Sequence, residues 1–216
     1  MVSTPNFYYK DSKGTNVAIC VPVRDYVTSS FTFSLSMLMK KCGETNQKTS
    51  LHMVMGSEVA MQRQQLVEQA LETACTHILW LDSDMLFPSN LLQALLSHEK
   101  DIIACNYSTR VEPHRPVAFD NPGNLDSRVL SGEGLQSVFA VGAGCMLVKR
   151  QVYEQMPRPH YSVTWNEDYS NMVGEDIFFC EKAREHGYEI WVEKTLSNSI
   201  GHSGTKIYTL KGDCNV

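Results

Sequence analysis

Two acidic side chains, separated by one residue, follow an apolar segment of the chain. Asp82 and Asp84 come directly after residues 77–81 (HILWL), a pattern that predicts a buried strand. Residues two apart in an extended backbone point to the same side, so both carboxylates can face one hard cation, Mg²⁺ or Mn²⁺. The alternative is a solvated turn whose aspartate caps a helix opened by Pro88. The two residues alone leave both interpretations open.

A second acidic pair opens a predicted helix. Glu175 and Asp176 follow Gly174, and the helix is expected over residues 174–186. One of the two carboxylates has the chemistry of a general base for an acceptor hydroxyl. Acidic residues in a first helical turn also complement the helix dipole, which gives the pair a purely structural alternative.

A third polar segment, residues 201–206 (GHSGTK), places His202 between two glycines and four positions before Lys206. Glycines let the backbone approach a ligand closely. An imidazole is a better ligand for Mn²⁺ than for Mg²⁺, and a lysine can contact phosphate oxygens. The segment therefore suits a metal and a diphosphate.

The elements that must position these residues alternate between strand and helix. Strands are expected at 17–23, 50–55, 77–81 and 101–105, and helices at 30–41, 58–75 and from Pro88. This order predicts an α/β fold with a mostly parallel, doubly wound central sheet flanked by helices. Ligands of such folds gather at the carboxyl ends of the strands.

The second half of the chain does not continue the regular alternation of strands and helices. Residues 108–137 predict a long connection or antiparallel excursion, and 157–173 an aromatic-rich loop. Residues 138–148 are expected to return to the sheet, and 188–192 to form its last strand. A smaller antiparallel portion of the fold is expected here.

Composition limits the partners and the compartment. The net charge is −5 and there is no basic run, which argues against a nucleic-acid partner. No apolar run is long enough for a transmembrane segment, and the spacing of the seven cysteines excludes Cys-x-x-Cys motifs. Buried free thiols in a reducing, cytoplasmic location are expected. An acidic protein that handles an anionic nucleotide needs a bound cation to offset repulsion.

The order of LDSDM, GEDIFF and GHSGTK, after the opening segment VPVRD, resembles the GT-A fold glycosyltransferases. The resemblance covers residues 17–206, and the chain is similar to small glycosyltransferase domains encoded by phages and large algal (chlorella) viruses. It implies one domain over 1–216, with a nucleotide-binding half at 1–106, a donor-sugar and acceptor half at 107–206 and a tail at 207–216. If the protein is viral, the location becomes the host cytoplasm.

The resemblance also implies roles for individual residues. The nucleotide, by family expectation UDP, would lie near Pro22, Arg24 and Asp25. Mn²⁺ or Mg²⁺ would be held by Asp84 and His202, with Asp82 contacting the metal or the ribose. The remaining donor-side positions implied are Arg63, Ser83, the small-residue loop Gly142, Ala143 and Gly144, and Lys206.

On the acceptor side, Asp176 is the expected base if the enzyme inverts configuration, whereas Glu175 or Asp176 positions the acceptor if it retains. Tyr161, Trp165 and Tyr169 have rings able to stack on a sugar, with loop packing as the alternative. Nothing in the spacing chooses the stereochemistry, the sugar or the acceptor.

The sequence therefore predicts a metal-dependent glycosyltransferase of the hexosyltransferase type (EC 2.4), which moves a sugar from a nucleotide diphosphate to a hydroxyl of a glycan or glycoprotein. One rival, a sugar-phosphate nucleotidyltransferase, usually has a glycine-rich basic loop after its first strand. This chain has VPVRDY at 21–26 instead. The other rival is a non-catalytic nucleotide-sugar or glycan-binding module, which does not need Glu175 and Asp176.

Overall fold

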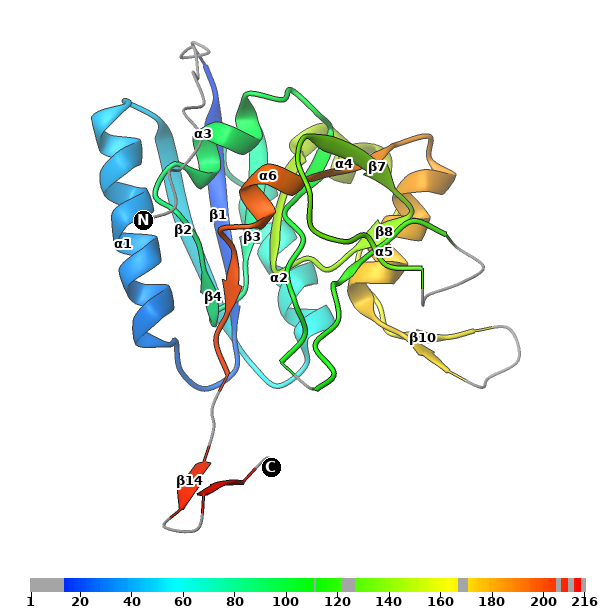
Figure 1. Ribbon diagram of the computed structural model, residues 1–216. Coiled ribbons are helices and arrows are strands. Elements are labelled where there is room, and N and C mark those ends of the chain that lie inside the picture. The colour runs from blue at the N-terminus through cyan, green and yellow to red at the C-terminus, as the bar shows by residue number, and fades with distance from the viewer. Residues whose placement is uncertain are drawn as a thin grey trace.

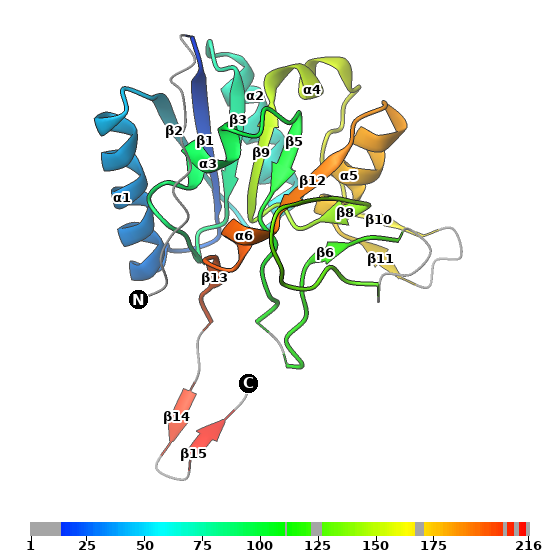
Figure 2. The same ribbon diagram turned by 45° about the horizontal axis from the view of Figure 1, so that its top comes forward.

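The computed structural model of the protein describes residues 14–110, 112–121, 127–166, 171–204, 207–209 and 212–214, the last two ranges as backbone only. Two residues with predicted roles, Tyr169 and Lys206, lie outside the described residues. Figures 1 and 2 show the chain in two orientations.

The first half of the chain follows the predicted alternation. Its elements are β1 (Asn16–Val23), α1 (Ser29–Glu44), β2 (Lys48–Met55), α2 (Val59–Leu71), β3 (His77–Leu81), β4 (Met85–Leu86), α3 (Leu91–Leu96) and β5 (Ile102–Ala104). The prediction that Pro88 opens a helix was wrong by one turn. The carbonyl of Pro88 accepts a hydrogen bond from Leu91 N at 3.1 Å, which closes a turn ahead of α3.

The second half of the chain contains more and shorter elements than its sequence predicts. Its elements are β6 (Ala118–Phe119), β7 (Leu135–Val138), β8 (Ala140–Val141), β9 (Cys145–Lys149), α4 (Arg150–Gln155), β10 (Thr164–Trp165), β11 (Met172–Val173), α5 (Glu175–Glu185), β12 (Ile190–Glu193), α6 (Lys194–Ser197), β13 (Gly201–His202), β14 (Ile207–Thr209) and β15 (Gly212–Cys214). Residues 138–148 are not one strand, because 142–144 separate β8 from β9. Two short helices, α4 and α6, were not predicted.

Within the described residues, seven strands form one sheet in the order β2-β1-β3-β9-β5-β12-β7. β1 pairs with β2 and β3 in parallel, and β12 pairs with β5 in parallel. β9 is antiparallel to both β3 and β5, and β7 is antiparallel to β12. The expectation of a mostly parallel sheet is met only in part, because β9, between β3 and β5, and β7, at the edge, both run antiparallel to their neighbours.

Helices cover both faces of this sheet, as the two views of the ribbon show (Figures 1 and 2). On one face, Val17, Ile19 and Val21 of β1 pack with buried residues of α1, α3 and α6. On the other, Trp80 and Met146 pack with buried residues of α2, α4 and α5. Alternating side chains of each strand feed the two cores, so the strands are fixed on both sides and their ends are rigidly placed.

Two sequence expectations about the whole chain meet the structure here. The cysteines at 20, 42, 75, 105, 145 and 180 are buried free thiols. Among the described residues, no helix has the length and apolar composition needed to cross a membrane.

Candidate active site

The carboxyl ends of β1, β3 and β5 meet at one edge of the sheet, and hydrogen bonds join the segments that follow them. Thr28 N donates to Ser83 O at 3.1 Å, which connects the segment after β1 to the segment after β3. β13 pairs with β4, and Ser203 N donates to Asp84 O at 2.8 Å. Pairing of β13 with β4 is therefore what carries His202 next to the Asp82–Asp84 segment.

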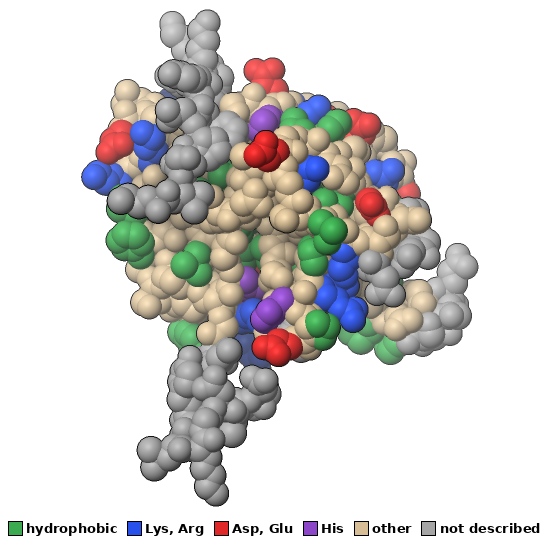
Figure 3. All heavy atoms as spheres, in the orientation of Figure 1, with side chains coloured by type: hydrophobic (Ala, Val, Ile, Leu, Met, Phe, Trp, Pro, Cys, Tyr) green, Lys and Arg blue, Asp and Glu red, His purple; other side chains and the backbone are tan. Residues whose placement is uncertain are grey.

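A cavity of about 350 Å³ opens among these segments. Its lining residues are Arg24, Asp25, Tyr26, Thr28, Ser83, Asp84, Arg110, Ser203 and Gly204. Figure 3 shows acidic, basic and histidine side chains close together near the lower edge of the face in view. Of the predicted nucleotide-side residues, Arg24, Asp25 and Ser83 line the cavity, whereas Pro22 is buried in β1 and is not part of the lining.

Asp84 lines the cavity and contacts two basic side chains. Its Oδ2 lies 2.7 Å from Nη1 of Arg110, and its Oδ1 lies 3.4 Å from Nε2 of His202. Burial opposes ionisation, but the hydrogen bond and charge of His202 and the charge of Arg110 hold the pKa of Asp84 below its ordinary value. Burial likewise works against a charged His202, yet its contacts with Asp84 and Ser108 raise the pKa of the imidazole above its ordinary value.

His202 and Asp84 suit a shared cation. The Nδ1–H of His202 donates to the carbonyl of Ser108 at 3.0 Å, which turns Nε2 toward Asp84. Metal-binding histidines commonly have such a backbone partner on the second nitrogen. Two protein ligands are enough where a diphosphate and water supply the other positions. In the described part of the chain, however, no group of three or more His, Cys, Asp or Glu side chains lies close enough to hold a metal.

Asp82 does not complete such a group among the described residues, and its contact with the metal or the ribose stays a prediction. Residues 82–85 form a turn closed by Met85 N donating to Asp82 O at 3.1 Å, so the alternation of an extended strand does not apply. Oδ1 of Asp82 lies 2.7 Å from Nη2 of Arg63, whereas Asp84 contacts Arg110 and His202. The two carboxylates thus have separate partners.

Arg63 is buried, whereas the sequence prediction had it reaching the donor. Its side chain is 2% exposed and does not line the cavity. Its Nε lies 3.2 Å from Oε1 of Glu175, so the guanidinium contacts both acidic motifs. Burial acts against its charge, but Asp82 and Glu175 raise the pKa of Arg63, and it remains a cation.

Asp176 has a perturbed carboxyl group at the start of α5. Burial, followed by the charge of Glu175, raises its pKa from 3.8 to about 6. Oδ1 of Asp176 accepts a hydrogen bond from Ile177 N at 2.8 Å, so the carboxylate folds over the helix start. A Cβ on Gly174 would lie 2.8 Å from that oxygen, which explains the glycine before the pair.

The loop Gly142–Gly144 encloses a residue that the sequence prediction did not include, Tyr107. Gly144 N donates to the hydroxyl of Tyr107 at 3.1 Å. A Cβ on Gly144 would lie 2.6 Å from that hydroxyl and 2.8 Å from Oδ2 of Asp82. Burial, with the charges of Asp82 and Asp176, raises the pKa of Tyr107 well above its ordinary value, so its hydroxyl stays protonated. Between the glycines, Ala143 is buried.

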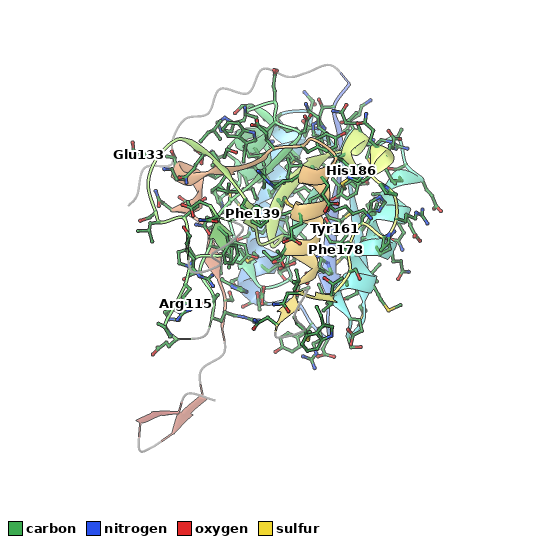
Figure 4. All side chains as sticks on the ribbon, turned by 90° about the vertical axis from the view of Figure 1, so that its right-hand side faces the viewer. Arg115, Glu133, Phe139, Tyr161, Phe178 and His186 are labelled. Atoms are coloured by element: carbon green, nitrogen blue, oxygen red, sulfur yellow. The ribbon has the colours of Figure 1, made fainter. Side chains whose placement is uncertain are left out.

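The three aromatic residues expected at the acceptor have different surroundings. Tyr161 is 3% exposed, stacks on Phe179 with ring centroids 5.0 Å apart, and bonds to the hydroxyl of Tyr153 at 2.9 Å. Figure 4 shows Tyr161 beside α5. It is a core residue, and its predicted contact with an acceptor was wrong. Trp165 on β10 is 55% exposed and free to meet a ligand. Tyr169 lies outside the described residues.

Gly144→Ala should destabilise the protein by about 1–3 kcal/mol, the usual cost of overpacking. The new methyl group would displace the Tyr107 hydroxyl or the Asp82 carboxylate. A matched control is Gly43→Ala, because a Cβ there meets nothing within 4 Å and the residue lies inside α1. That control should be neutral or more stable, since alanine is the better helix former. Urea unfolding of the three proteins measures both effects, and equal midpoints would contradict the close approach at Gly144.

The site residues that the sequence prediction missed include Arg110, Tyr107, Tyr26 and Thr28. A signal was present for the first two, because they follow the predicted strand 101–105 at its carboxyl end. Tyr26 follows β1 in the same way. Arg110 and Tyr107 belong to no short recognisable motif, so only the rule about strand ends points to them.

Comparison with protein-family profiles gives a match over part of the chain. The Anp1 family profile, which describes mannosyltransferase-like glycosyltransferases, matches residues 43–127. This range contains Arg63, Asp82, Asp84 and Arg110 but ends before Glu175 and His202. No curated protein matches the sequence. The Anp1 match supports a glycosyltransferase-like function for the chain.

Two solved structures match the chain to different extents. The viral protein A197 from STIV superposes with a TM-score of 0.58 and 12% identity, over 91% of this chain and 98% of that chain. At this identity the agreement concerns the fold only. A glycosyltransferase involved in the glycosylation of the major capsid of PBCV-1 has a TM-score of 0.37 and 14% identity, over 64% of this chain and 62% of that one, an overlap too low to carry an argument.

Proposed function

We propose that the protein is a metal-dependent glycosyltransferase that moves a hexose from a nucleotide diphosphate, with UDP as the first expectation, to a hydroxyl of a glycan or glycoprotein. The observation that carries the proposal is the wall of the 350 Å³ cavity, where Asp84 contacts both His202 and Arg110. A carboxylate, an imidazole and a guanidinium in contact beside the carboxyl ends of β3 and β5 suit a diphosphate and its counter-ion.

In this proposal each residue has one task. The segment Arg24–Thr28 holds the nucleoside, and Asp84 with His202 would hold Mn²⁺ or Mg²⁺, which when bound supplies positive charge to the leaving diphosphate. Arg110, half-exposed beside Asp84, donates to phosphate oxygens. Asp176 accepts the proton of the acceptor hydroxyl if configuration is inverted. Trp165 offers a ring on which an acceptor sugar stacks.

Nucleotide diphosphate binding should depend on a divalent cation. We expect calorimetry to give UDP an affinity about 10- to 100-fold higher with Mn²⁺ than with a chelator, because binding of an anion by an acidic protein needs the cation. GDP and CDP in parallel identify the base. Asp84→Asn should abolish the difference. The control Asp101→Asn, at the opposite end of β5, should retain it.

Equal UDP affinity in Mn²⁺ and in chelator would remove the metal from the proposal. Product analysis separates the remaining classes. A nucleotidyltransferase would release pyrophosphate from a nucleoside triphosphate and a sugar phosphate, whereas a transferase releases the nucleoside diphosphate from a nucleotide sugar. We expect only the second reaction.

A further inference from the structure

One buried guanidinium, that of Arg63, connects two acidic motifs that lie far apart in the sequence, at Asp82 and at Glu175. Arg63 comes from the first turns of α2, Asp82 from the turn after β3, and Glu175 from the start of α5. Nη2 of Arg63 lies 2.7 Å from Oδ1 of Asp82, and Nε lies 3.2 Å from Oε1 of Glu175. Two different nitrogens of one planar group thus serve two different carboxylates.

The surroundings hold this guanidinium in place. Its central carbon lies 5.2 Å from the ring centroid of Trp80 and 5.9 Å from that of Tyr161, both buried. Next to Arg63, Gln62 donates to Val23 O at 2.6 Å and to Val54 O at 2.7 Å, which ties the start of α2 to the ends of β1 and β2. Arg63 therefore projects from a helix turn that hydrogen bonds hold to the sheet.

The third nitrogen, Nη1, is buried and has no hydrogen-bond partner among the described residues. Leaving a buried donor unpaired is unfavourable, and a buried charge is tolerated only where its partners hold it well. A residue needed only for packing would be better replaced by an apolar one of similar volume. The arrangement keeps a cation where it contacts both carboxylates.

We propose that Arg63 is a positioning residue, which fixes the turn at Asp82 and the start of α5 relative to each other. It sets the distance between the donor side of the site and the acidic pair Glu175–Asp176. The inference rests on the proposed function for its effect on rate, but the coupling between the two segments is a property of the protein without any substrate.

Arg63→Lys tests the geometry while it keeps the charge. Lysine presents one ammonium in place of the rigid fork, so it cannot reproduce both contacts in the same arrangement. We expect kcat for sugar transfer to fall about 10- to 100-fold, because misplacement by about 1 Å has effects of this size. The KM for the donor should change less than about threefold, since Arg63 does not line the cavity.

Hydrogen exchange supplies a readout that needs no activity. In Arg63→Lys, amides of residues 82–86 and 174–178 should both exchange at least about threefold faster than in the wild type, because each loses part of the same anchor. The matched control is Arg158→Lys, whose Nη1 lies 2.9 Å from Oε1 of Glu68, also on α2, in an exposed pair. That control should leave both segments and kcat unchanged.

Glu175→Ala tests the same connection from its other end and keeps the guanidinium. Exchange should then rise not only at 174–178 but also at 82–86, although Glu175 has no bond to the second segment. Exchange confined to the mutated segment in both variants would overturn the inference. If the wild type transfers no sugar from any donor, the proposed function fails, and the exchange results still decide whether Arg63 couples the two segments.

Discussion

Replacing Asp176 by asparagine should lower the rate of sugar transfer by about 10²- to 10⁴-fold, the usual loss when a general base is removed. Asparagine has nearly the same shape and can still accept the hydrogen bond from Ile177 N, so α5 should start as before. UDP affinity should change little, because Asp176 is not among the residues lining the cavity. Rate, affinity and melting temperature are to be measured on one preparation.

A matched control for this substitution is Glu185→Gln, at the last turn of the same helix. It removes a carboxylate from α5 far from the acidic pair and should leave the rate unchanged. A purely structural role for Asp176 predicts another pattern, in which turnover stays normal and only stability changes. A rate within about threefold of the wild type would remove Asp176 from the catalytic residues and leave Glu175 as the candidate.

The second large effect concerns pH. Since the pKa of Asp176 is raised to about 6, we expect the transfer rate to be steady above this pH and to fall about tenfold for each unit below it. At pH 4 the ionised fraction, and with it the rate, should be down about 100-fold. The apparent pKa belongs to the pair Glu175–Asp176, because the two charges interact.

Stability should respond to this carboxyl in the opposite direction, which separates lost ionisation from acid unfolding. A carboxyl whose pKa is higher in the folded protein than in the unfolded chain binds more protons when folded. Its contribution to the free energy of unfolding is therefore full below the unfolded pKa and is lost as pH rises through 6. Rate profiles taken with unfolding curves at each pH check both directions, and a flat rate between pH 4 and 7 would contradict a base with this pKa.

The sequence by itself determined the order of the elements in the first half of the chain. Buried strands such as β1 and β3 are continuous apolar runs, and α1 and α2 have helical periodicity, so local pattern was enough. It also placed Arg24, Asp25, Ser83 and Asp84 at strand ends, where a cavity is found. The rule that ligands gather at the carboxyl ends of strands needs only the order of elements.

Only the tertiary structure decided which charges meet. The antiparallel insertion of β9 between β3 and β5, and the pairing of β13 with β4, depend on contacts between distant segments that no local pattern encodes. The turn at 82–85 separated the two aspartates, which a strand would have aligned. In the folded protein the buried Arg63 contacts Asp82 and Glu175, and Tyr161 lies in the core. Side-chain partners follow from the packing of whole elements, and this is why residue types and spacing identified the site but not its internal connections.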